Sequence, residues 1–173
     1  MASLLFQNAI DYRRVRIHAR RYMPFQPSNC AMTPNGHLYF HPSCFLDDYA
    51  QASVTGQHWF LHEMAHVWQH QLGYAVRLRG AVRFGLSYQY DLAPGKTLAD
   101  FNMEAQGDLL ADYFSLRHLI SSAPMRQPRY ASSLSLYEEV LAGFLADPAS
   151  VANLPRGYGR CLLHLKRRSR RKV

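Results

Sequence analysis

The fold of this chain is decided by Gln57-His58-Trp59-Phe60-Leu61-His62-Glu63-Met64-Ala65-His66-Val67-Trp68-Gln69-His70. This stretch contains the pattern H-E-x-x-H. On a helix, residues four apart lie one turn above each other, so His62 and His66 can hold one metal ion between them. Glu63 is turned about 100° from His62, which sets its carboxylate beside the ion, where a base takes a proton from metal-bound water. The spacing therefore predicts a metal site on a helix.

The residues around this pattern follow a helical period. The apolar side of the helical wheel carries Phe60, Leu61, Met64, Ala65, Val67, Trp68 and Leu72. The polar side carries His58, His62, Glu63, His66, Gln69 and His70, with Trp59 among them. We predict a helix from about Ser53 to Leu72, capped by Gly73, that buries its apolar side and turns its imidazoles toward a cleft. A coincidental polar helix face is the alternative.

A third metal ligand is needed, because a catalytic zinc site takes three protein ligands and one water. No histidine occurs between His70 and His118, and the chain has four glutamates, Glu63, Glu104, Glu138 and Glu139. Glu63 is taken as the base, and the last two glutamates follow a proline-containing linker over residues 121–133. Glu104 lies on the next strong helix, predicted over residues 98–120. We therefore predict one Zn²⁺ per chain, bound by His62, His66 and Glu104.

The predicted helix that carries Glu104 also offers a supporting carboxylate. Asp108 lies one turn after Glu104, and a carboxylate there can accept the N–H of a ligating histidine and raise its basicity. Gly107 lets another part of the backbone approach closely. A solvated face that carries Glu104 and Asp108 is the alternative for this helix.

H-E-x-x-H followed on a later helix by E-x-x-x-D resembles the gluzincin branch of zinc metallopeptidases. The segments 33–36, 62–69 and 104–108 are similar, more narrowly, to the small zincin domains tied to Rhs and VgrG spike proteins of bacterial type VI secretion. The resemblance covers about residues 12 to 120. It implies an α+β zincin-like metallopeptidase fold, with a short sheet and an active-site helix, and a hydrogen bond from His62, rather than His66, to Asp108.

The same resemblance implies an antibacterial effector that is made in the cytoplasm without a signal peptide and secreted into the periplasm of a target cell. Its expected partners are a peptide or protein substrate, a secretion spike protein and an immunity protein. Zincins of this kind bind substrate along an edge strand before the active helix, a place that Gly36-His37-Leu38-Tyr39-Phe40 occupies in this sequence.

The expected reaction is hydrolysis of a peptide bond. The ion lowers the pKa of its water from 15.7 toward about 7 and polarises the carbonyl, and Glu63 passes the proton to the leaving amine. A further donor is expected to stabilise the oxyanion, and the sequence leaves four candidates open. These candidates are Tyr88, Tyr90, Tyr113 and His118.

Two other functions remain open. One is a DNA-associated peptidase resembling the SprT-like group, which uses a third histidine that this chain lacks in the expected region. The other is a catalytically silent zinc-binding interaction module. Glu63 argues against the silent module, because metal binding does not require that residue.

Length and composition predict one zincin-like domain over residues 1–165. Of the 173 residues, 48% are hydrophobic and 18% charged, and no apolar run approaches the length of a membrane span. Residues 1–10 lack the features of a secretory signal. The three cysteines, Cys30, Cys44 and Cys161, form no C-x-x-C pair, which favours packed thiols over a cysteine-based zinc site.

The net charge of +8 is concentrated at the end of the chain. Six cations lie in residues 166–173, so the rest carries 8 − 6 = +2. We predict that this basic tail is disordered and solvated, because like charges repel and little apolar surface can be buried. Contact of the tail with nucleic acid or anionic lipid is the alternative.

Local patterns suggest the remaining elements. Alternation over residues 15–19 predicts a first strand, Thr33-Pro34-Asn35-Gly36 a tight turn, and residues 38–40 a second strand. Residues 74–90 mix features of strand and loop, and residues 135–146 form a third helix that stops at Pro148.

Overall fold

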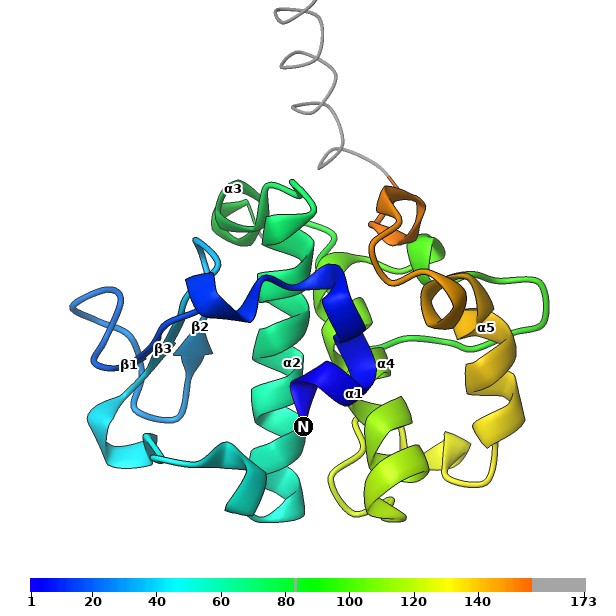
Figure 1. The fold of residues 1–173 in the computed structure, drawn as a ribbon, viewed down its shortest axis with the longest axis horizontal. Helices are drawn as coiled ribbons and strands as arrows, with labels where there is room; N and C mark the ends of the chain where they lie inside the picture. Colours follow the sequence, from blue (N-terminus) through cyan, green and yellow to red (C-terminus); the bar gives the residue numbers. More distant parts are fainter. Residues whose placement is uncertain (83, 157–173) are drawn as a thin grey trace, which may run out of the picture.

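The computed structural model describes residues 1–82 and 84–156 of the chain. Its architecture is mixed α+β, as predicted, and is organised around the long helix α2 (Val54–Gln71). Figure 1 shows a small sheet on one side of α2 and two helices, α4 (Met103–Phe114) and α5 (Leu134–Ala146), on the other. The short helix α1 (Ala2–Phe6) carries buried side chains into the core against α2. The predicted basic tail lies outside the described residues.

The sheet has three short strands, β1 (Ile17–Ala19), β2 (Ala31–Met32) and β3 (Leu38–Phe40), in the order β1-β3-β2. β3 runs parallel to β1 and antiparallel to β2. Leu38 and Phe40 are fully buried, and the Phe40 ring meets the Trp59 ring of α2 edge-on at 5.0 Å between centroids. The alternation of β3 thus turns one face of the sheet toward α2.

The prediction that residues 36–40 form an edge strand is wrong. β3 is the central strand, because the two-residue strand β2 pairs with its second side. The sequence offered no pattern for β2, which is too short to show alternation. Among the residues that the structure describes, the outer strands of the sheet are β1 and β2.

Helix α2 agrees with its prediction in length and ends. Ser53 caps it by accepting a hydrogen bond from Gly56 N, and Gly73 follows it with a φ of 92°, a conformation that glycine adopts without strain. Its polar side is less open than predicted. His58 is only 8% exposed and Gln69 is fully buried, because α4 packs along this side of α2.

The second predicted helix is shorter than expected at both ends. Asn102 caps α4 by accepting from the backbone N–H groups of Glu104 and Ala105, so residues 98–100 form a separate 3₁₀ turn. After Phe114 the chain forms one π turn over Ser115–Leu119 and stops at Ile120, whose φ is 49°. The third predicted helix is confirmed as α5.

Residues 76–81 lie in the region that mixed features of strand and loop, and neither interpretation holds for them, because they form the short helix α3 (Val76–Ala81). Other short 3₁₀ turns cover Gln7–Ala9, Tyr12–Arg14, Pro42–Cys44, Tyr49–Gln51, Pro128–Tyr130 and Val151–Asn153. Within the described residues, no helix combines the length and the apolar character needed to cross a membrane. Cys30 and Cys44 are partly buried, and their Sγ atoms lie within hydrogen-bond distance of the carbonyl oxygens of Ala31 and Ser28. Cys161 lies outside the described residues.

Candidate metal centre

Three predicted ligands meet where α2 packs against α4. His62 Nε2 lies 3.1 Å from His66 Nε2, and Glu104 Oε2 lies 3.3 Å from the first of these atoms and 3.2 Å from the second. His62 and His66 come together because they are one turn apart on α2, and Glu104 because it lies in the first turn of α4. All three residues are buried, with exposures of 5 to 8%.

This triangle fits the donor set of a catalytic zinc site. Ligand bonds of about 2.0–2.2 Å in a tetrahedron require ligand atoms about 3.3–3.6 Å apart. The observed separations are close to that range, and two imidazoles with one carboxylate leave a fourth position for water. It is the one group of three such side chains, among the residues described, whose ligand atoms converge in this way.

Asp108 lies one turn beyond Glu104 and makes the predicted contact. Its Oδ1 lies 2.8 Å from His62 Nδ1, which leaves Nε2 of the same ring directed at the centre. Its Oδ2 accepts a 2.8 Å hydrogen bond from Arg126 Nε. Burial raises the pKa of Asp108, but His62 and Arg126 outweigh burial and hold that pKa below its usual value. Asp108 therefore stays an anion that orients the ring of His62.

His66 is oriented by a neutral group. Its Nδ1 lies 2.8 Å from Gln69 Oε1, three residues further along α2. Gln69 is held by α4, since its Nε2 donates to Met103 O and to Gln106 Oε1, both at 3.0 Å. The amide oxygen accepts the proton of Nδ1, so Nε2 of His66 keeps its lone pair for the centre.

Gly107 makes the close packing of α4 against His62 feasible. A Cβ at this position would lie 2.7 Å from His62 Nδ1 and 2.8 Å from Cε1, closer than such atoms approach. The predicted close approach is therefore present, and the group that approaches is the ring of His62 rather than a backbone segment.

Glu63 lies one residue beyond His62 and is 5% exposed. Its Oε2 accepts a 2.6 Å hydrogen bond from the hydroxyl of Thr33, the residue that follows β2. Thr33 fixes the direction of the carboxylate and joins the end of β2 to the site. In the sequence, Thr33 was noted as part of a turn and of the segment 33–36 that carries the family resemblance, and no role at the site was assigned to it.

The imidazoles of His62 and His66 lie within 3.3 Å of the carboxylates of Glu104 and Asp108, so the protonation of each group depends on the others. Burial lowers the pKa of His62, but hydrogen bonds to Asp108 and Glu104 and the charges of Asp108 and Glu63 outweigh burial and raise that pKa to about 10. Burial raises the pKa of Glu104, but His66 and His62 outweigh it and hold the pKa well below its usual value. In the metal-free chain at pH 7, His62 therefore carries a proton that compensates the carboxylates.

Zinc uptake is expected to release at least one proton per ion, because His62 is protonated below about pH 10 and must be neutral to bind. Affinity should then weaken as the pH falls, by about tenfold per pH unit for each proton released. Calorimetric titration in buffers of different ionisation enthalpy measures the proton number. Proton release would be contradicted if the binding enthalpy were the same in all buffers and the zinc affinity did not change with pH.

Replacing Asp108 with asparagine is expected to weaken zinc binding by about 10–100-fold, because an amide holds the His62 ring less well and makes it less basic. Competition with a chelating dye measures the change. Asp147→Asn is the matched control, since its Oδ1 accepts from Ala149 N far along the chain from the centre. Equal affinities for the two variants would show that Asp108 does not support the metal.

Of the four candidate oxyanion donors, Tyr88 alone lies against the predicted ligands. Its ring stacks on His62 at 5.8 Å between centroids, and Arg126 Cζ lies 5.1 Å from the centre of the Tyr88 ring. Tyr113 is buried on α4, where burial and the nearby Glu138 raise its pKa. His118 is exposed in the π turn and packs on Phe114.

Tyr90 belongs to a second buried polar cluster. Its hydroxyl hydrogen-bonds the fully buried Asp112 and the hydroxyl of Tyr137. Asp112 also contacts His58 Nε2 at 2.6 Å and accepts from two backbone N–H groups, those of Arg126 and Gln127. This cluster ties α2, α4, α5 and residues 126–127 together and keeps Arg126 beside Asp108.

Besides Thr33, three further residues that support the site were given no role from the sequence, although some signals were present. Gln69 lies three residues after His66 on the same helix face, a spacing that makes contact possible. Asp112 continues the series of Glu104 and Asp108 at four-residue intervals. Arg126 carried no signal, because it lies in the predicted linker and reaches the site only through the fold.

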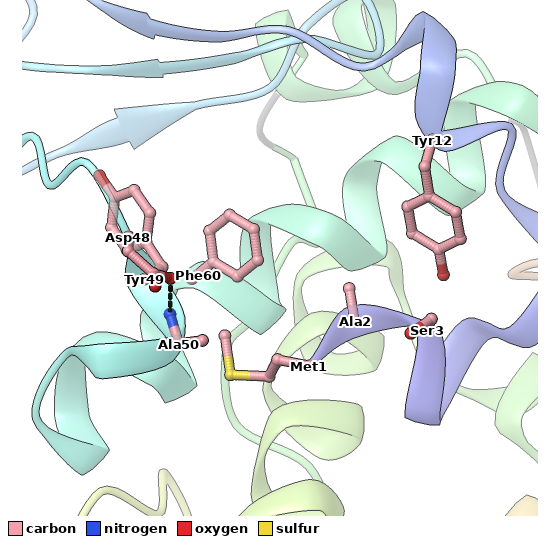
Figure 2. Close-up of a pocket in the computed structure, with 8 residues that line it drawn as sticks. All are labelled: Met1, Ala2, Ser3, Tyr12, Asp48, Tyr49, Ala50 and Phe60. Carbon is pink, nitrogen blue, oxygen red and sulfur yellow. Dashed lines mark hydrogen bonds between the residues drawn. The ribbon is translucent and has the colours of Figure 1, made fainter.

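A separate pocket of about 390 Å³ lies between α1 and the side of α2 that carries Phe60. Its lining comprises Met1, Ala2, Ser3, Tyr12, Asp48, Tyr49, Ala50 and Phe60 (Figure 2). It shares no residue with the metal centre, so the chemistry of the centre is not carried by this pocket.

The chain is similar to known proteins. No family model matches the chain. Over 121 residues, 66% of this chain, it is 44% identical to the type VI secretion system spike protein VgrG2b of Pseudomonas aeruginosa, and the match spans 12% of that protein. The solved effector domain of Pseudomonas aeruginosa VgrG2b has a TM-score of 0.65 and 38% sequence identity, with 81% of this chain and 78% of that domain covered. The chain therefore belongs to the family of the VgrG2b effector domain.

Proposed function

We propose that this chain is a zinc-dependent peptidase of the gluzincin type that hydrolyses peptide bonds. The observation that carries the proposal is the triangle formed by His62 Nε2, His66 Nε2 and Glu104 Oε2, with separations of 3.1 to 3.3 Å. Glu63 stands directly after the first ligand, which a purely structural metal site does not require. The buried carboxylate of Asp108 behind His62 adds the support that such sites use.

A zinc ion held by His62, His66 and Glu104 would polarise the scissile carbonyl and lower the pKa of a water molecule. Glu63 would accept the proton of that water on its carboxylate, which the Thr33 hydroxyl holds in a fixed direction. Glu63 would then deliver the proton to the leaving amine. Tyr88, stacked on His62, is the proposed donor to the oxyanion, with its hydroxyl as the donating group.

The substrate is proposed to lie along the free edge of β2 rather than along β3. β3 is paired on both sides, whereas β2 pairs with β3 alone among the described residues. Thr33 directly follows β2 and bonds Glu63, so a peptide added to this edge would pass the proposed base.

The proposed biological role is that of a type VI secretion effector with a VgrG-type spike protein as its partner. This rests on membership of the VgrG2b effector-domain family. The periplasm of a target cell remains the proposed place of action, and an immunity protein the proposed second partner. The silent-module alternative is separated from the peptidase by the assay that follows. The described residues bring Glu104, and no third histidine, to His62 and His66, so nothing favours the SprT-like alternative.

The test is hydrolysis of an unfolded protein, such as reduced casein, by the zinc-loaded chain. Cleavage should stop when a chelator removes the metal and return when zinc is added back. Mass spectrometry of the fragments identifies the cleaved bonds. A chain that binds zinc and cleaves neither casein nor a diverse peptide library would be a silent zinc-binding module, and the peptidase proposal would be withdrawn.

A further inference from the structure

The sheet part of the molecule carries a concentrated positive charge. Residues 12–46 contain five arginines, no lysine, and no aspartate or glutamate. With the six cations of the basic tail set aside, the remaining residues carry 8 − 5 − 6 = −3. The charge of the body is therefore divided between a cationic sheet and a net anionic helical part. We call the five side chains the arginine surface; they are Arg13, Arg14, Arg16, Arg20 and Arg21.

The side chains of the arginine surface are exposed and largely uncompensated. Among the described residues, the one ion pair that involves them joins Arg13 Nε to Asp11 at 3.2 Å, on an exposed part of the surface. Arg16 donates to the carbonyl oxygens of Arg13 and Val15 at 2.7 and 2.9 Å, which holds its guanidinium without neutralising it. Arg20 lies over the Tyr39 ring at 5.8 Å.

Two histidines lie on the same outer face. His18 stacks on Tyr39 at 4.6 Å and faces the His37 ring at 6.0 Å. Burial, followed by the charges of Arg20, His37 and Arg16, lowers the pKa of His18. His37 Nδ1 is buried and makes no hydrogen bond within the described part of the chain. Burial is the largest cause of this shift, and the positive charges of Arg20 and Arg16, which add to it, are those that would attract an anionic partner.

We propose that the arginine surface binds acidic segments of polypeptides, and that it selects protein substrates with such segments near the scissile bond. Arginine pairs with carboxylates in two-point geometry, which suits glutamate and aspartate side chains. The surface belongs to the same small sheet as the residue that contacts the proposed base. β3 lies between β1 and β2, so β1 is two strand spacings, about 10 Å, from β2, and Thr33, which follows β2, bonds Glu63. The selection of substrates rests on the proposed peptidase function, whereas binding itself does not.

The low exposure of Tyr39 beside the arginine surface favours an acidic polypeptide over a nucleic acid as the partner. Single strands of nucleic acid bind on a series of free rings on which the bases stack. Here Tyr39 is 6% exposed and is covered by His18, Arg20 and Tyr22. Phe25, which is 95% exposed, offers one free ring in the loop after Arg21.

The test compares a fluorescent glutamate-rich peptide with its glutamine-rich counterpart by anisotropy, using the full zinc-loaded chain. The acidic peptide should bind about tenfold more tightly or better, and the difference should shrink as salt is added. Arg16→Gln with Arg20→Gln should abolish the preference. Arg77→Gln with Arg117→Gln is the matched control, since both arginines are exposed in the helical part and their loss changes the charge equally.

Several outcomes overturn the proposal. Equal binding of the two peptides, or an unchanged preference in the Arg16/Arg20 variant, shows that the surface does not recognise carboxylates. Stronger binding of oligothymidylate than of the acidic peptide, lost in the same variant, assigns the surface to nucleic acid. Melting curves identify a variant that fails to fold, and Arg14→Gln with Arg21→Gln then replaces it.

A second experiment, which measures hydrolysis, distinguishes failure of the acidic-segment proposal from failure of the proposed peptidase function. For a cleavable peptide with acidic flanks, the Arg16/Arg20 variant should raise KM about tenfold and leave kcat unchanged. A fall in kcat with constant KM would contradict a binding role. Selective binding by a chain that cleaves nothing would keep the acidic-segment site and remove only its role in selecting substrates.

Discussion

Replacing Glu63 with glutamine is expected to lower the rate of peptide hydrolysis by about 10²–10⁴-fold, because the amide cannot accept the proton of the attacking water. The fold and the zinc content should stay as they are, since Glu63 lies beside the three ligand atoms and the amide oxygen can still accept from Thr33. The measurement is the steady-state rate of casein cleavage, together with the zinc content and a melting curve.

Glu138→Gln is the control for this variant. Glu138 is exposed on α5, and its replacement makes the same change of charge and size. Its rate should equal that of the unmodified chain. Hydrolysis close to the normal rate in Glu63→Gln would remove Glu63 from the mechanism and point to another base.

Loss of the Glu104 carboxylate is expected to have the largest effect on the metal. In Glu104→Ala, the centre keeps two imidazoles, and zinc affinity should fall by more than about 100-fold, beyond the range for supporting residues. The two histidines also lose the anion that contributes to their raised pKa values, so they compete less strongly for protons. Elemental analysis after dialysis against a weak chelator measures the zinc that remains.

Glu139→Ala serves as the control for Glu104→Ala, since Glu139 lies on the exposed side of α5. A zinc content and affinity in Glu104→Ala that match this control would refute the assignment of the third ligand. Zinc affinity should fall less in Asp108→Asn than in Glu104→Ala, because loss of a supporting residue weakens binding less than loss of a ligand.

The sequence was most informative where chemistry depends on helical spacing. His62 and His66 share a face because they are four residues apart, and Asp108 follows Glu104 by the same rule. Glu104 could be selected because the chain has only four glutamates. These inferences required only the spacing of residues along two helices and the number of glutamates in the chain. They did not require knowledge of how the helices pack.

The parts that sequence reasoning missed depend on contacts between distant segments. Thr33 reaches Glu63 across 30 positions of sequence, and Arg126 reaches Asp108 from a segment that lacks regular structure. β3 was predicted as an edge strand because the two-residue β2 shows no alternation, and pairing with β2 makes β3 central. The buried polar side of α2 was likewise invisible, since its cover is α4.

Anomalous diffraction at the zinc absorption edge, from crystals of the full chain grown with zinc, tests the central claim most directly. The account predicts one strong peak per chain, bonded to His62 Nε2, His66 Nε2 and Glu104 Oε2, with Glu63 beside the fourth position. A peak bound by other residues, or no peak at this centre while zinc is present in the crystal, would contradict it.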